Sequence, residues 1–570
     1  MLRAEIDGLN IELEEKTSIL DAAKKANINI PTLCYEDGLS IYGGCRLCVV
    51  EIEGEDLLKP ACATKIEAGM KIKTHSKKVR DLRKNLFELI IATHNIDCQL
   101  NCLTCSRASN CELKDIAEDI GLSKMRLDPI KRGDSIDNSS YSIVREPEKC
   151  ISCNRCIRKC EEVQGIGIFT TANRGPETVV TTFKDRGMGN VECTNCGQCI
   201  LSCPTGALHE LYQKDSVLDI LNDESKHVVV QTAPAVRVAI SESFSNQAGD
   251  ISTGQLVTAL KRLGFDAVFD TNFAADLTIM EEGTELINRI KSGDRLPLFT
   301  SCSPGWIKFI EHFYPEHLDN LSTAKSPQQM FGAVAKSYYA KEAGIAPDDI
   351  IVVSVMPCTA KKFESKREEM AGDVDYVLTT RELASIIKSA GIDFLNLEES
   401  EYDDLLGVSS GAADIFGTTG GVMEAALRTA SELITGEELE KIEFENVRGL
   451  EGIKKTEVVI GDLKLRAAVA NGLGNARKVM EMIKDGEEFD FIEFMACPGG
   501  CMGGGGQPIS SDKNVLEKRQ QAIYEIDNNK KMRKSHKNPY IKKLYDDYLE
   551  KPGSEIAHKL LHTKYKARKI

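Results

Sequence analysis

The sequence predicts small α+β modules in the first third of the chain and one large α/β domain behind them. Sixteen of its 20 cysteines fall before residue 204, in tight groups that are typical of metal sites. From about residue 225, β-branched apolar runs alternate with amphipathic helical stretches, which is the pattern of a parallel sheet covered by helices. At 570 residues and 42% hydrophobic content, the chain is long enough for about four average domains.

Composition and charge exclude several classes of protein. A net charge of −15 argues against binding to nucleic acid. There is no run of 18 apolar residues and no leader-like start in MLRAEIDGLNIELEEKT, so neither a membrane span nor a secretory signal is expected. We therefore expect a cytoplasmic protein whose cysteines bind metal rather than form disulfides.

The first module, residues 1–77, opens with MLRAEIDGLNIEL, an alternating pattern that predicts a strand. Four cysteines follow with the spacing C-x10-C-x2-C-x13-C, and the loop GLSIYGGC brings glycines beside them. Four thiolates hold an iron–sulfur cluster, whereas zinc sites favour two short C-x2-C pairs. The spacing resembles that of plant-type 2Fe-2S ferredoxins, so we predict a β-grasp module with the ligands Cys34, Cys45, Cys48 and Cys62.

The second module, residues 78–118, contains HNIDCQLNCLTCSRASNCEL, which has one ligand more than a cluster needs. It resembles the motif H-x3-C-x2-C-x5-C of 4Fe-4S sites with one histidine ligand, with four residues inserted. Cys98 keeps the spacing to the histidine, whereas Cys102 keeps the C-x2-C-x5-C spacing. We favour the ligands His94, Cys102, Cys105 and Cys111. Two alternatives stay open: Cys98 in place of Cys102, and His94 as an ordinary surface histidine.

The third module, residues 139–212, carries the runs KCISCNRCIRKC and ECTNCGQCILSCP. Each run reads C-x2-C-x2-C-x3-C, and in bacterial two-cluster ferredoxins the fourth cysteine of each run binds the other cluster. One predicted 4Fe-4S ligand set is therefore Cys150, Cys153, Cys156 and Cys203, and the other is Cys193, Cys196, Cys199 and Cys160. With the first two modules, these clusters would form an internal wire for single electrons.

In the large domain, residues 225–510, three predicted strands end in a cysteine, in LPLFTSC, DIIVVSVMPC and FDFIEFMAC. Sites in α/β folds gather beyond the carboxyl ends of strands. We therefore expect the remaining thiolates to converge on one more cubane cluster: Cys302, Cys358, Cys497 and Cys501. On this chemical argument Ser303, which precedes a proline, is the N-cap of a helix.

At this point the residues resemble a known family along essentially the whole chain. FTSCSPGW, TIMEEGTEL, VMPCTAKKFE and EFMACPGGCMGGGGQP are similar to motifs of clostridial-type iron-only (FeFe) hydrogenases, and residues 511–570 to the small-subunit segment of that family. The resemblance implies that the large α/β domain holds an H-cluster, a 4Fe-4S cubane joined through a cysteine to a diiron unit with carbonyl, cyanide and dithiomethylamine ligands. It also implies reversible reduction of protons to hydrogen, ferredoxin or a similar carrier as electron partner, and maturation proteins that insert the diiron unit.

The resemblance also implies roles for individual residues of the large domain. Cys501 matches the bridging cysteine, and Lys361 matches a lysine that holds a cyanide ligand. The apolar wall around the diiron unit would include Met356, Met495 and Phe416, and the resemblance adds two further cofactor-binding residues, Pro234 and Gln328. The proton path would run from Cys302 through Glu282, Ser322 and Glu285, with Arg289 holding the outer carboxylate.

The chain departs from the family at Ser303. The family has two adjacent cysteines here, the first a proton donor and the second a cubane ligand, so Cys302 takes the donor position and Ser303 the ligand position. Ser303 could ligate through oxygen, Cys302 could move across to ligate, or the cubane could lack one protein ligand. Because a serine hydroxyl is a poor iron ligand, the sequence slightly favours a displaced Cys302.

This departure leaves two functions to compare. The first is an enzyme that evolves or consumes hydrogen, and the second is a redox sensor or electron-transfer protein of low turnover. The carboxylates of the proton path favour the enzyme, since a sensor does not need them. A purely structural assembly factor does not explain the GGGG loop or Lys361.

Overall fold

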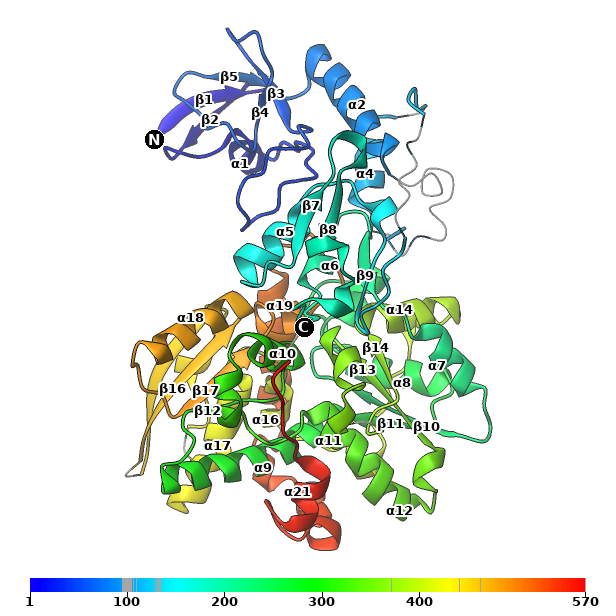
Figure 1. Cartoon of the computed structure of the whole chain (residues 1–570), viewed down its shortest axis with the longest axis vertical. Coiled ribbons are helices and arrows are strands. Elements are labelled where there is room, and N and C mark those ends of the chain that lie inside the picture. The colour runs from blue at the N-terminus through cyan, green and yellow to red at the C-terminus, as the bar shows by residue number, and fades with distance from the viewer. Residues whose placement is uncertain are drawn as a thin grey trace.

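The computed structural model describes residues 1–94, 105, 107–108, 110–122, 124–128, 130, 135–370, 372–439, 441–461 and 463–568 (Figure 1). The cysteine-rich modules stack at one end of the molecule, and the large domain forms the other end. Within the described ranges, no helix combines the length and the apolar character that crossing a membrane requires.

The first module is a five-stranded sheet with the order β2-β1-β5-β3-β4. Its elements are β1 (Leu2–Ile6), β2 (Leu9–Leu13), α1 (Ile19–Lys25), β3 (Val49–Ile52), β4 (Lys59–Pro60) and β5 (Lys71–Lys73). The expectation of one strand over MLRAEIDGLNIEL is wrong, because the segment is a hairpin with Ile6 opposite Leu9. Asp7 and Gly8 both have positive φ, 48° and 86°, which is the two-residue turn that an Asp-Gly pair favours.

The second module contributes α2 (Lys77–Ala92) and α4 (Glu112–Asp119). The third module has two small antiparallel sheets, and a short helix lies within each of its cysteine runs. These elements are β6 (Ile143–Arg145) paired with β9 (Leu208–Glu210), β7 (Phe169–Ala172) paired with β8 (Val179–Thr182), α5 (Arg155–Arg158) and α6 (Gln198–Ser202).

The large domain contains two four-stranded sheets rather than one. The first is entirely parallel: β11 (Ala267–Asp270), β10 (His227–Thr232), β13 (Ile350–Met356) and β14 (Tyr376–Thr379). In the second only the edge strand β15 is antiparallel: β12 (Leu298–Phe299), β17 (Phe491–Met495), β16 (Leu463–Asn471) and β15 (Ile453–Ile460). The central strands are buried on both faces, as expected for parallel sheets covered by helices.

Helices cover both sheets of the large domain. They are α7 (Lys214–Leu221), α8 (Thr253–Arg262), α9 (Thr271–Ser292), α10 (Pro304–Phe313), α11 (Pro327–Val334), α12 (Ala340–Ala343), α13 (Ala360–Glu364), α14 (Thr380–Ser389), α15 (Asp404–Gly407), α16 (Gly411–Asp414), α17 (Gly421–Thr435) and α18 (Leu473–Lys484). The longest of them, α9, begins directly after β11, packs on α11 and α17, and contributes apolar side chains to the cores of both sheets.

The C-terminal segment extends over the large domain to the end of the molecule farthest from the front modules (Figure 1). Its helices are α19 (Val515–Asn529), α20 (Pro539–Leu544) and α21 (Glu555–Leu561). Buried ion pairs fasten it. Arg428 of α17 is fully buried and donates to both carboxylate oxygens of Asp527, at 2.9 and 2.8 Å, and to Glu424 at 2.6 Å.

Replacing Arg428 by methionine is expected to destabilise the large domain by up to about 3–5 kcal/mol, because the buried carboxylates of Asp527 and Glu424 lose their fully buried partner and keep only Arg533 and Arg448. Scanning calorimetry would detect this as a lower Tm of that domain. The matched control is Arg466→Met, which removes a half-exposed arginine paired with Asp490 and should change Tm little. Equal shifts in the two variants would contradict the expected role of Arg428.

Candidate active site

The three strand ends that were expected to converge do so, although they belong to different sheets. Cys358 follows β13 of the first sheet, whereas Cys302 and Cys497 follow β12 and β17 of the second. All three line one cavity of about 90 Å³, together with Cys501. The cavity therefore lies where the carboxyl ends of the two sheets face each other.

Every residue that the sequence assigned to the immediate surroundings of the cluster lies on this cavity. Besides the four cysteines, the lining includes Ser303, Lys361, Pro234, Met356, Met495, Phe416 and Gln328. Burial raises the pKa of Cys497, and the nearby thiols of Cys358 and Cys501 raise it further. Three thiols thus lie close together in a buried, largely apolar space, which suits a group that needs several sulfur ligands.

The glycine loop after Cys501 allows a close approach between backbones. A Cβ atom at Gly504 would lie 2.2 Å from the carbonyl oxygen of Pro357, and one at Gly505 would lie 2.4 Å from that of Cys196. Real Cβ atoms do not come so close, so these positions require glycine. The loop therefore closes the cavity against the third module, and Cys196 of that module reaches the cavity lining.

Lys361 is held in place by residues that the sequence analysis missed. Its Nζ donates to Ser326 at 2.7 Å, to Glu364 at 2.8 Å and to the carbonyl oxygen of Cys302 at 3.2 Å. Glu364 also accepts hydrogen bonds from Ser326 and Gln328. The only sequence signal for this network is the i,i+3 spacing of Lys361 and Glu364 on one helix.

Ser303 is the residue before α10, as expected, but its side chain does not cap that helix. Instead its Oγ accepts the backbone N–H of Ala496 at 3.2 Å. The expected N-cap hydrogen bond is therefore wrong, because the strand end at Ala496 offers a donor that local sequence does not reveal. This bond holds the Ser303 hydroxyl beside Cys497 on the cavity wall.

Cys302, the residue before Ser303, also lines the cavity. Burial raises its pKa well above the usual range, and the carboxylates of Glu282 and Glu493 raise it further. The thiol of Cys501 also raises the pKa of Cys302, whereas the cation of Lys361 lowers it. Cys302 thus has both Glu282 and Cys501 among its electrostatic neighbours. Glu493 was missed by the sequence analysis, since it is one polar residue inside an apolar strand.

The carboxylates of α9 form the expected row. Glu282 is fully buried, and burial raises its pKa to about 8, which the nearby Ser322 hydroxyl only partly offsets. Across the described residues, neither of its carboxylate oxygens has a hydrogen bond of normal geometry. Farther out, Glu285 accepts from Ser322 at 3.2 Å and from Arg289 at 2.6 Å. The four predicted residues of this path therefore lie in the expected order.

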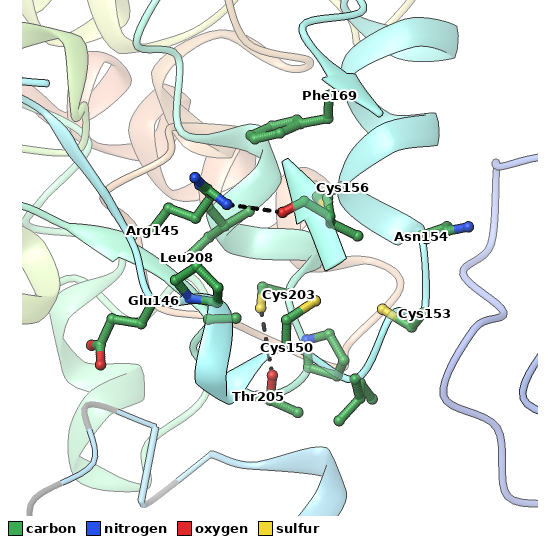
Figure 2. A pocket seen from close by; sticks show the side chains of 15 residues that line it. Arg145, Glu146, Cys150, Cys153, Asn154, Cys156, Phe169, Cys203, Thr205 and Leu208 are labelled. Carbon is green, nitrogen blue, oxygen red and sulfur yellow. Dashed lines mark hydrogen bonds between the residues drawn. The ribbon is translucent and has the colours of Figure 1, made fainter. Parts of the chain in front are cut away.

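The two cysteine runs of the third module interleave as their spacing suggested. One small cavity is lined by Cys150, Cys153, Cys156 and Cys203, and the thiols of Cys150, Cys153 and Cys203 face one another there (Figure 2). A second is lined by Cys160, Cys193, Cys196 and Cys199. Backbone N–H groups point at the sulfurs: Ser152 at Cys150 and Asn195 at Cys193, both at 3.4 Å.

The first module also brings its cysteines together. Cys48 and Cys62 lie with their sulfurs 3.4 Å apart, and both are buried, as is Cys34, whereas Cys45 is half-buried. In the second module, His94 and Cys111 are buried and Cys105 is half-buried. Cys98 and Cys102 lie outside the described residues.

Both front modules contact the third module next to its cysteine runs. Glu36 of the first module pairs with Lys159 at 3.0 Å, and Arg158 donates to the carbonyl oxygen of Cys34. Glu112 of the second module pairs with Arg155 at 2.7 Å. Since Cys196 reaches the large cavity, the cysteine groups form a continuous series from the front of the molecule to that cavity.

Known protein families match the chain from end to end. Residues 226–505 match the C-terminal domain of the iron only hydrogenase large subunit, and residues 513–568 match the iron hydrogenase small subunit. The front matches a 2Fe-2S iron-sulfur cluster binding domain, the iron-sulfur binding region of NADH-ubiquinone oxidoreductase-G and the ferredoxin-like domain of NADH-quinone oxidoreductase subunit 3. These matches cover residues 1–77, 83–126 and 140–209.

Individual relatives agree with these matches. The chain is 50% identical to the NADP-reducing hydrogenase subunit HndD of Solidesulfovibrio fructosivorans, over 99% of both chains. It is 43% identical to iron hydrogenase 1 of Clostridium pasteurianum, over 98% of this chain and 99% of that one. A solved structure of an apo FeFe-hydrogenase variant from Chlamydomonas reinhardtii has 45% identity and a TM-score of 0.58, covering 63% of this chain and 100% of its own.

These findings confirm the predicted fold class, with ferredoxin-like iron–sulfur modules in front of an α/β H-cluster domain. The chain belongs to the iron-only (FeFe) hydrogenases, as an enzyme of their multi-cluster form.

Proposed function

We propose that this enzyme catalyses the reversible reduction of protons to hydrogen, with electrons that arrive one at a time through the front modules. The observation that supports this most strongly is the position of Cys302. Its thiol lines the same cavity as Cys501, and its pKa is raised by burial and by Glu282, the inner carboxylate of the buried row. A site for proton transfer needs such a titratable group between the reacting centre and the route to solvent.

The donor set fits the implied cofactors. Cys358, Cys497 and Cys501 offer three thiols on one cavity that would suit a cubane, and the Ser303 hydroxyl on the same cavity would take the fourth position. When bound, the H-cluster would supply the redox chemistry of hydrogen formation. Lys361 and Gln328 would offer donors to its anionic ligands, while Met356, Met495 and Phe416 would exclude water. The front would add one 2Fe-2S and three 4Fe-4S clusters, on the ligand sets named above.

We infer that Cys302 is the proton-transfer residue and not a displaced cubane ligand. The sequence slightly favoured displacement, but two features argue against it. Among the charged groups, Glu282 has the largest effect on the pKa of Cys302, and the carbonyl oxygen of Cys302 accepts a hydrogen bond from Lys361. Ser303, by contrast, is held beside Cys497 by its bond to Ala496.

The electron partner is proposed as a one-electron carrier such as ferredoxin. A partner subunit that links the front clusters to NADP is the second candidate, because the 50% identical relative is an NADP-reducing hydrogenase subunit. A low-turnover sensor is the alternative function, since Ser303 stands where the family has a cysteine. Either enzyme form would depend on maturation proteins for the diiron unit.

The first test is hydrogen evolution from chemically reduced viologen by protein with reconstituted iron and a loaded diiron unit. Turnover at a rate typical of an enzyme, roughly 1–10³ per second, would support the proposed function. Full iron content without turnover would favour the sensor. Adding reduced ferredoxin, or NADPH with candidate partner subunits, then distinguishes the two electron donors.

Ser303→Cys is expected to keep the fold and strengthen retention of the cubane, because a thiolate is a better iron ligand than a hydroxyl. Iron content after exposure to a chelator measures this. Ser303→Ala is the matched variant and should lose iron faster than the unchanged protein. If all three forms retain iron equally, the side chain at position 303 is not a ligand.

A further inference from the structure

The outer end of the proton path has a branch that the path described so far does not use. Oε2 of Glu285 accepts not only from Ser322 but also from Thr323, from its backbone N–H at 3.0 Å and from its Oγ1 at 3.1 Å. Ser322 leads inward to Glu282. Thr323 lies on the other side and leads toward the C-terminal segment.

Thr323 is in direct contact with a half-buried histidine of that segment. Its Oγ1 lies 2.8 Å from Nδ1 of His562, the residue that follows α21. Two backbone contacts hold this pair in register. Thr563 donates its N–H to the carbonyl oxygen of Thr323 at 2.7 Å, and Ala324 forms an isolated β-bridge with His562.

The other ring nitrogen of His562 is also engaged. Nε2 lies 3.0 Å from Oε2 of Glu281, whose carboxylate further accepts from the hydroxyl of Tyr545 and the backbone N–H of Gly553. A carboxylate at Nε2 keeps the proton on that nitrogen and leaves Nδ1 as the nitrogen that exchanges a proton with Thr323. The exposed ring of His558, one turn earlier, packs on His562 with centroids 4.3 Å apart, so the branch ends near solvent.

We propose that Thr323 and His562 form a second branch of the proton path, through which His562 exchanges a proton with Glu285. This inference rests on the proposed function. In the forward step, the Nδ1–H bond of the imidazolium breaks as Oγ1 of Thr323 takes the proton. The Oγ1–H bond breaks in turn as Oε2 of Glu285 takes the second proton. The result is a neutral imidazole and a neutral carboxyl group, and no electron moves.

Several titratable groups surround the imidazole of His562 and would contribute to the pH profile of hydrogen evolution. Glu281 and Tyr545 face it from α9 and the C-terminal segment, and His558 faces it from its own helix. Beyond Thr323 lie Glu285 and its partner Arg289. His562 is thus a positioning and proton-exchange residue that acts through Glu285, at a distance from the cavity itself.

The test compares Thr323→Val and His562→Gln with the control His536→Gln. Valine removes the hydroxyl at constant shape, and glutamine can form hydrogen bonds but cannot titrate. His536 is another half-buried histidine of the C-terminal segment, bonded to Glu432 at 2.8 Å and not to Glu285. Hydrogen evolution would be measured against pH in H2O and D2O, with reduced viologen as donor.

Thr323→Val and His562→Gln should lower turnover by roughly three- to tenfold and raise the solvent deuterium isotope effect. The loss stays partial because Glu285, whose side chain is partly exposed, still exchanges protons with solvent directly. His536→Gln should change neither the turnover nor the isotope effect. If both branch variants keep the rate, pH profile and isotope effect of the unchanged enzyme, the proposal fails. It also fails if all three variants slow equally, since the effect would then be structural.

A second readout does not depend on turnover. The infrared carboxyl band of Glu285, assigned by its loss in Glu285→Gln, should shift as pH changes the charge of His562. That shift should vanish in Thr323→Val and in His562→Gln but persist in His536→Gln. Absence of hydrogen evolution in the unchanged protein would overturn the proposed function, whereas an infrared shift that survives in both branch variants would overturn the branch.

Discussion

Glu282→Gln is expected to lower hydrogen evolution by about 10²- to 10³-fold, because glutamine has the shape of glutamate but cannot carry a proton between Cys302 and the outer carboxylate. Among the described residues, both carboxylate oxygens of Glu282 are buried and lack a hydrogen-bond partner of normal geometry. Turnover with reduced viologen measures the loss. Iron content and the electron paramagnetic resonance signals of the clusters should be unchanged.

The pH dependence of hydrogen evolution is a second test of the role of Glu282 in proton transfer. With a pKa near 8 the carboxyl of Glu282 is protonated at neutral pH, so evolution should fall as pH rises through about 8. The sign for stability agrees. Because the folded-state pKa lies above the ordinary value of 4.5, the stability that Glu282 contributes is full below 4.5 and is lost as pH rises through about 8.

The matched control is Asp276→Asn, which also replaces a buried carboxylate of α9 by its amide. Burial raises the pKa of Asp276 to about 6, but its partners Ser410 and Asn538 lie away from the cavity. Turnover should therefore be retained in this variant. Retained turnover in Glu282→Gln, or equal losses in the two variants, would remove Glu282 from the proton path.

Cys302→Ala is expected to lower turnover by about 10³-fold or more while every cluster stays in place, because alanine keeps the cavity wall but removes a thiol that has both Glu282 and Cys501 as neighbours. Two measurements are needed together: the rate of hydrogen evolution, and the iron content with the cubane's paramagnetic signal. A loss of rate without a loss of iron is the expected result.

The opposite outcome is equally informative. If Cys302→Ala loses the iron of one cubane, Cys302 is a ligand and the displaced arrangement is correct. Ser303→Ala provides the comparison, because Ser303 lines the same cavity but is bonded to Ala496 rather than placed beside Glu282. Cys302→Ala should therefore lose proton transfer and keep its iron, whereas Ser303→Ala should lose iron.

Local features of this protein were predictable from the sequence. The runs around Cys150 and Cys193 have spacings of two and three residues that only a tight loop can satisfy, and the two small cavities are lined by the two sets of thiols expected. Glu282, Glu285 and Arg289 lie within two turns of one helix, so their common face follows from helical periodicity. The hairpin at Asp7 and Gly8 was missed although its signal was also local.

By itself, then, the sequence determined the order of the iron–sulfur modules, the strand ends that carry Cys302, Cys358 and Cys497, and the membership of the family, because these depend on residues close together in the chain. The tertiary structure alone decided that two separate sheets face each other across the cavity and that Ser303 bonds to Ala496, 193 residues away. It also decided that Thr323 meets His562, 239 residues away. Such contacts depend on how whole elements pack, and packing leaves no period or spacing in the sequence.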